Sequence, residues 1–130
     1  MEEIRKKTIE DLGTLSEDIR QQALKLNDTN NKIQKLQEYL KTVKMDLVIA
    51  INKETITDPK TGKETKKYTN EASRTAELER RMKANKDAKD AKLNLDALVR
   101  KKAIEEIDYQ YERDKFSASK AIARILMEKE

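Results

Sequence analysis

The chain has 130 residues and a mass of 15.1 kDa, which suits a single domain. Charged residues make up 42% and aromatic residues 4%, with two Gly and one Pro, so we exclude a turn-rich β fold and a Pro/Gly-rich disordered chain. The formal net charge is only +4, and without Cys or His the chain has no disulfides, thiolate chemistry, usual zinc sites or imidazole catalysis, so we expect no enzyme and no cofactor.

The chain begins with Met1-Glu2-Glu3 and shows neither a basic segment followed by an apolar run nor any apolar stretch near 18 residues. We therefore expect a cytoplasmic protein without membrane contact.

The first expected element is a helix over about residues 2–52. Its apolar residues recur at alternating steps of three and four, which favours a coiled-coil register over a generic amphipathic helix. Two positions of this series are polar, Gln22 and Thr29; they either set the register or form solvated weak spots, and the second interpretation is favoured. The apolar members are Leu12, Leu15, Ile19, Leu26, Ile33, Leu36, Leu40, Val43, Leu47 and Ala50.

The one strong break lies at about residues 53–69. Pro59 suits the opening of a turn, Asp58 can accept a hydrogen bond from the backbone just ahead, and Gly62 can adopt a positive φ. The flanking Thr residues, with Ile56 and Tyr68, favour a short two-stranded β-ribbon, with a mobile loop as the alternative.

The second expected helix covers about residues 70–128, capped by Thr69 or Asn70, and folds back on the first as an antiparallel hairpin. Its apolar residues form two nearly opposite faces, so we expect two partners. One face, expected to pack on the first helix, comprises Leu78, Met82, Leu93, Ile104, Ile107, Tyr111, Ala118, Ile122 and Ile125. The other, expected to lack an intrachain partner and to form a homo-oligomer interface, comprises Ala84, Ala88, Ala91, Leu95, Leu98, Tyr109 and Phe116, with Met127 beside them.

Carboxylates at positions 105, 108 and 112 share a helical face, but neighbouring Lys and Arg offer ion pairs, so we expect a solvated surface and no metal site.

Charge is uneven along the second helix: residues 80–102 carry nine basic and three acidic side chains, whereas residues 105–114 carry five carboxylates and one Arg. With the lysines of the turn, the basic stretch could hold a phosphate backbone without reading sequence, although a solvated helix flank explains the same charges. The expected nucleic-acid-binding residues are Lys63, Lys66, Lys67, Arg80, Arg81, Lys83, Lys86, Lys89 and Lys92.

The segment from Tyr68 to Met82 contains the pattern Tyr-x-Asn-Glu-x-x-Arg-x-Ala-Glu. It resembles a stretch of small bacteriophage proteins in which this pattern opens a long charged helix after a short Gly-containing turn. The resemblance implies a setting in phage replication or recombination modules, near single-strand annealing recombinases, and therefore in the host cell cytoplasm.

The sequence thus predicts an all-α protein, one long antiparallel helical hairpin of coiled-coil type with a ribbon or loop at the turn. The expected function is a non-enzymatic, oligomeric accessory of phage DNA replication or recombination that contacts DNA or a replication or recombination protein. The alternative is a structural or prefoldin-like helical scaffold without DNA contact, because prefoldin subunits also have a helix, β-ribbon, helix order.

Overall fold

The computed structural model describes residues 2–128, and these are mostly helical. The prediction of an all-α chain is confirmed, as are the first helix and the ribbon. The elements in chain order are α1 (Glu2–Lys53), β1 (Thr55–Thr57), β2 (Glu64–Lys66), α2 (Glu71–Ala84) and α3 (Lys86–Glu128).

The chain divides into two compact units, and the division falls inside α1 and inside α3. Unit 1 contains residues 2–32 and 98–128, and thus the first part of α1 and most of α3. Unit 2 contains Ile33–Ala97, and thus the end of α1, the ribbon, α2 and the start of α3.

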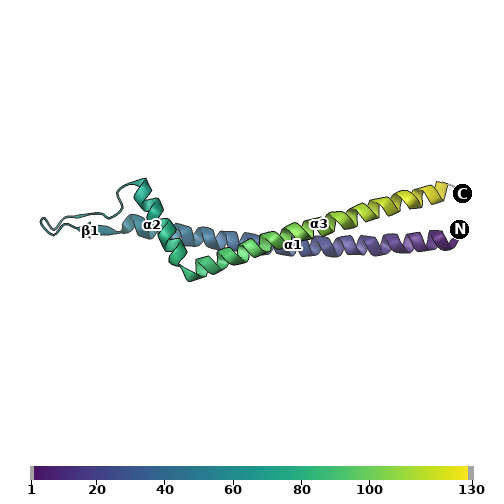
Figure 1. The fold of residues 1–130 in the computed structure, drawn as a ribbon, viewed down its shortest axis with the longest axis horizontal. Helices are drawn as coiled ribbons and strands as arrows, with labels where there is room; N and C mark the ends of the chain where they lie inside the picture. The colour runs from purple at the N-terminus through teal and green to yellow at the C-terminus, as the bar shows by residue number, and fades with distance from the viewer. Residues whose placement is uncertain (1, 129–130) are drawn as a thin grey trace. The chain divides into compact units, whose positions relative to one another are not determined.

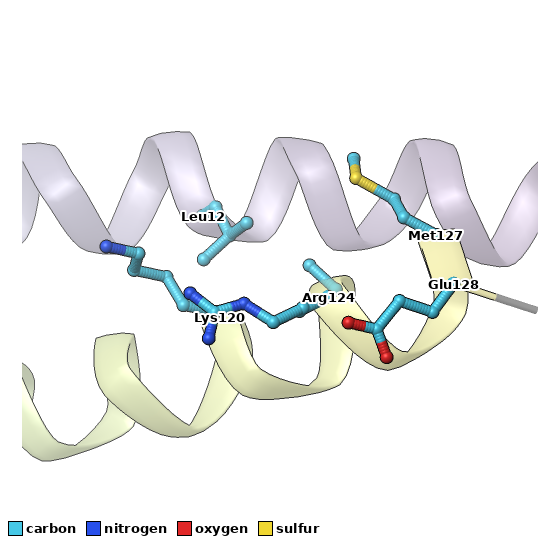
Figure 2. Close-up of a pocket in the computed structure, with 6 residues that line it drawn as sticks. Leu12, Lys120, Arg124, Met127 and Glu128 are labelled. Atoms are coloured by element: carbon cyan, nitrogen blue, oxygen red, sulfur yellow. The ribbon is translucent and has the colours of Figure 1, made fainter.

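In unit 1, α1 and α3 lie side by side and run antiparallel, so that the start of α1 and the end of α3 lie at the same end of the unit (Figure 1). Two contacts show the antiparallel direction. Thr29 of α1 is hydrogen-bonded to Glu105 of α3, and Leu12, which comes before Thr29, shares a groove with Met127, which comes after Glu105. Figure 2 shows Leu12 pointing from α1 toward α3 and Met127 pointing from α3 toward α1.

The covered stripe of α1 follows the predicted steps of three and four. From Leu12 to Leu47 every member of the series is buried or half-buried, the polar Gln22 and Thr29 included. At the end of the helix Ile51 takes the covered position, and Ala50 is exposed. The interpretation of Thr29 as a solvated weak spot is wrong, because its exposed fraction is 1%.

Thr29 is covered because α3 supplies a polar partner at the same level. Its hydroxyl donates to both carboxylate oxygens of Glu105, at 2.9 Å each, and the Lys101 Nζ lies 3.7 Å from Glu105 Oε1. Glu105 is 8% exposed, so the expectation of a solvated carboxylate here is also wrong. A buried carboxylate is tolerated when hydrogen bonds and a counter-charge compensate its lost hydration.

The face of α3 that packs in unit 1 also follows steps of three and four, and we call it the inner face. It contains Leu98, Lys102, Glu105, Tyr109, Glu112, Phe116, Ser119, Ala123 and Leu126, all buried or half-buried. The face containing Ile104 and Ile107 is exposed. The assignment of the two faces from sequence is therefore reversed.

Unit 2 contains the ribbon, whose strands pair antiparallel with Thr55 opposite Lys66 and Thr57 opposite Glu64. As predicted, Asp58 accepts from the Lys60 N–H through its Oδ1, at 2.8 Å, and Gly62 has a φ of +69°. The Gly62 N–H also donates to the Asp58 carbonyl oxygen at 2.8 Å, which closes the turn. An L side chain at that φ would be strained.

The expected second helix is interrupted at Asn85, which separates α2 from α3. Asn70 begins α2 as predicted, accepting from the Ser73 N–H at 2.7 Å. Asn85 has an extended backbone with φ −79° and ψ 107°. Its N–H donates to the Arg81 carbonyl and its side-chain oxygen accepts from the Ala88 N–H, so one residue ends α2 and begins α3. Asn is a favoured N-cap residue, and this is the signal that the sequence offered.

Candidate nucleic-acid interface

The net charge of the chain resides in unit 2. Residues 33–97 carry fifteen basic and eleven acidic side chains, whereas the rest of the chain carries fourteen of each. All nine residues expected to bind nucleic acid fall within unit 2. The fold therefore collects the candidate residues in one compact unit and leaves the other electrically neutral.

The ribbon presents its lysines to solvent. Lys63, Lys66 and Lys67 are exposed, as is every residue of both strands. The Lys67 N–H donates to the Glu54 carbonyl at 2.9 Å, which continues the pairing of the two chain segments beyond the strands. The ammonium of Lys67 lies 5.5 Å from the centre of the Tyr68 ring. A short, paired ribbon thus carries exposed cationic groups.

Arg80 and Arg81 are engaged by carboxylates rather than held free for phosphate. Arg80 donates to both oxygens of Glu77, at 2.6 and 3.0 Å. Arg81 donates to Glu77 at 2.8 Å and to Glu54 at 2.5 Å, which ties α2 to the residue that follows α1. Hydrogen bonds from Arg80 and then Arg81 lower the pKa of Glu77 to about 2, and the bonds to Glu54 and Glu77 raise the pKa of Arg81.

This arrangement changes the expected roles of the two arginines. Arg81 holds α2 to Glu54, whereas the bond from Arg80 to Glu77 stays within α2. Because both guanidinium groups are paired with carboxylates, they contribute less to a positive surface than unpaired lysines do. The spacing of Glu77 to Arg80 and Arg81, three and four residues along one helix, was a signal for this cluster that the sequence-based prediction did not use.

The lysines around the break at Asn85 form the most open part of the basic set. Lys83 lies in the last turn of α2, and Lys86 and Lys89 lie in the first turns of α3. These three lysines are exposed, and so is Lys92 one turn later. The start of a helix carries a partial positive charge from its unpaired N–H groups, which adds to the field of these lysines. The break therefore brings cations from two helices to one short segment.

The surroundings of these lysines do not suit base stacking. Tyr68 is half-buried beside Lys67, and Tyr39 is the other aromatic residue of unit 2. Single-strand platforms use several aromatic faces, one for each stacked base. The arrangement favours contact with phosphates over reading of bases.

The residues expected at an oligomer interface are mostly covered within the chain. Ala88 and Ala91 are buried and Leu95 is half-buried in unit 2, while Leu98, Tyr109 and Phe116 are half-buried in unit 1. Ala84 is exposed, and so is Met127, which the sequence placed on the same face. The premise that this face lacks an intrachain partner is wrong, since α3 turns it inward.

The groove in Figure 2 is an open depression of about 370 Å³ along the α1–α3 contact, lined by Leu12, Lys120, Ala123, Arg124, Met127 and Glu128. It holds two cations and one carboxylate at its rim and no nucleophile. In residues 2–128 no three acidic side chains are grouped to hold a metal ion, and no helix there combines the length and apolar character needed to cross a bilayer.

No protein-family model matches this chain, and no curated protein or solved structure matches it.

Proposed function

We propose that this chain is a non-enzymatic interaction protein that binds the phosphate backbone of DNA through unit 2 and self-associates through unit 1. The observation that supports the DNA role is the distribution of charge. The whole net charge of +4 falls in the unit that also carries the exposed lysines of the ribbon and of the α2–α3 break. Cations gathered in this way attract a polyanion and favour release of its counterions.

We propose that the helix pair of unit 1 is a coiled coil, and two observations support this. Both helices follow steps of three and four at their covered positions, and the polar Thr29 of one meets the polar Glu105 of the other. A helix pair of this kind is suited to bind further helices.

The biological setting that we propose is bacteriophage DNA replication or recombination, with DNA or a DNA-handling protein as the partner. It is supported by the resemblance of Tyr68–Met82, which in this chain spans the start of α2 and the Glu77–Arg80–Arg81 cluster. The genes beside the coding sequence test it directly: a replication or annealing gene there supports the setting, and unrelated neighbours remove it.

DNA binding is tested by fluorescence anisotropy with labelled single- and double-stranded oligonucleotides of unrelated sequence, at about 50 and 200 mM salt. We expect binding to both at low salt, with little dependence on sequence and a steep loss as salt rises. The combined change of Lys83, Lys86 and Lys89 to Glu should weaken binding at least about tenfold and flatten the salt slope by roughly one unit per lost phosphate contact.

A matched control places the same charge change in unit 1, where Lys6, Lys7 and Lys25 are exposed on α1. Their combined change to Glu alters the net charge equally but should leave most of the affinity, because the reversed charges lie outside unit 2. Equal losses in the two variants would show a response to net charge alone. No binding to either form of DNA at low salt would leave a protein-only scaffold role.

A further inference from the structure

The exposed side of α3 in unit 1 is strongly apolar, and we call it the outer face. It lies nearly opposite the inner face on the same helix. Its large side chains are far more exposed than an isolated, water-soluble helix pair requires. The members are Ile104 (61% exposed), Ile107 (69%), Tyr111 (60%), Ala118, Ile122 (54%) and Ile125 (53%).

The spacing of these six residues is symmetric about one point of the chain. Ile104 and Ile125 lie equally far from the peptide bond between Asp114 and Lys115. So do Ile107 and Ile122, and so do Tyr111 and Ala118. The spacing of the apolar residues on the outer face is therefore the same in both chain directions. Each isoleucine has an isoleucine at the equivalent position, and Tyr111 has the small Ala118.

Such symmetry is what two identical helices need in order to pack antiparallel. A two-fold axis reverses the direction of the second helix, so residues equally distant from the axis come to the same level. Ile104 then meets the partner's Ile125, and Ile107 meets the partner's Ile122. Tyr111 meets the partner's Ala118, which leaves room for the ring. A face that docks a foreign helix has no reason to be symmetric.

The centre of the symmetry carries two exposed charged residues, Asp114 and Lys115, on opposite edges of the outer face. An antiparallel two-fold axis keeps each edge on its own side, so each of these residues comes beside its own copy. Both are tied within their own chain, because Asp114 accepts a hydrogen bond from Gln110 Nε2 at 2.9 Å and the Lys115 ammonium lies 5.2 Å from the centre of the Tyr111 ring. Solvent screens the like charges at these edges, and the apolar residues between them carry the contact.

From this symmetry we infer that the outer face of α3 is the binding surface for a second copy of this chain, packed antiparallel about the Asp114–Lys115 bond. The paired segment from Ile104 to Ile125 is about 32 Å long at 1.5 Å per residue. The inference gives a surface to the self-association in the proposed function and does not depend on DNA binding. It also replaces the oligomer interface expected from sequence, which the chain itself covers.

The first test is sedimentation equilibrium over about 1–200 µM protein, with helicity followed by circular dichroism. We expect a monomer–dimer equilibrium in the wild-type chain. Ile107→Glu places a charge in the contact twice and should raise the dissociation constant at least about tenfold, with helicity unchanged because the residue is exposed. Leu24→Glu is the matched control, since Leu24 is 52% exposed on α1 in the same unit.

A wild-type chain that stays monomeric at the highest concentration overturns the inference and leaves a foreign partner as the occupant of the outer face. A dimer that Leu24→Glu dissociates and Ile107→Glu does not also overturns it. Anisotropy with labelled DNA, measured on the same variants, separates this result from the DNA role. Ile107→Glu leaves the lysines of unit 2 unchanged, so its affinity for DNA, measured at concentrations where the wild-type chain is monomeric, should match that of the wild-type chain.

The second test is disulfide cross-linking, which reports the direction of packing. Because the chain has no native Cys, any cross-link forms at the introduced residue. Asp114→Cys lies next to its own copy at the two-fold axis and should form an intermolecular disulfide under mild oxidation. Ile104→Cys lies about 30 Å from its own copy and should not, whereas a mixture of Ile104→Cys and Ile125→Cys chains should cross-link to each other. Cross-linking of Ile104→Cys to itself indicates parallel packing and overturns the inference.

Discussion

The two faces of α3 in unit 1 differ in a way that composition alone does not suggest. The inner face, which packs within the chain, includes the polar Glu105, Glu112 and Ser119, whereas the outer face holds four isoleucines and is exposed. The more apolar face is therefore not the one that the chain covers. The face of α3 that the chain buries is the one whose Glu105 can bond Thr29 of α1. The isoleucines of the outer face are left exposed to contact another surface.

The match is a matter of spacing. Thr29 bonds Glu105, and Gln22 and Glu112 lie seven residues further along each helix in opposite chain directions, so antiparallel packing brings them to one level. With the isoleucines facing α1, the Thr29 hydroxyl would lose Glu105 and would be left to donate to a backbone carbonyl of its own helix, as Thr14 and Thr42 do. The Thr29–Glu105 bond thus favours this face of α3 and this register.

The largest expected difference between the faces comes from two aromatic residues of the same helix. Phe116→Ala, on the inner face, should lower the free energy of unfolding by about 1.5–3 kcal/mol through lost packing. Tyr111→Ala, on the outer face, should lower it by less than about 0.5 kcal/mol in the monomer. Urea unfolding at about 1 µM measures both, and equal losses would contradict the assignment of the faces.

The buried polar layer gives the next largest effect. Thr29→Val keeps the shape but removes the donor to Glu105, and should cost about 1–3 kcal/mol in urea unfolding. The double change of Thr29 and Glu105 to Leu should restore or exceed wild-type stability, because no buried polar group is then left unpaired. Thr14→Val, at an exposed Thr bonded only to the Glu10 carbonyl, is the control. Additive losses in the double variant would argue against a coupled layer.

A smaller effect is expected at the centre of the outer face. Asp114→Asn removes the charge that the two-fold axis sets beside its own copy, and should strengthen the dimer by up to about threefold in sedimentation equilibrium. Asp18→Asn, at an exposed residue of α1 in the same unit, is the control and should leave the dimer unchanged. A dimer that Asp114→Asn weakens would place the axis elsewhere along α3.

Much of the fold could be predicted from the sequence because its signals are local. The three-four spacing fixed the covered stripe of α1, and Pro59, Asp58 and Gly62 specified the turn. The face of α3 that packs inward could not be read in this way, since it depends on which polar residues of two distant segments meet. A helical-wheel projection of α3 alone shows two apolar faces and does not indicate which of them packs on α1.

The candidate site was predicted only as a set of charges. The collection of the lysines in unit 2 follows from their positions along the chain, and their exposure could be expected. The engagement of Arg81 by Glu54 joins residues on different elements and has no signature in spacing. The break at Asn85 was missed because helix propensity over a long charged segment outweighs one capping residue in a sequence pattern.

The central claim is that α3 uses its inner face within the chain and its outer face for a second copy, and thiol labelling of single-cysteine variants tests both halves together. Phe116→Cys and Ala123→Cys report the inner face, and Tyr111→Cys and Ile122→Cys report the outer face. We predict that the inner thiols react slowly at every protein concentration, whereas the outer thiols react fast at about 1 µM and more slowly as the dimer forms near 100 µM. Outer thiols whose rate does not change with concentration, or inner thiols that react as fast as the outer ones in dilute protein, would contradict the claim.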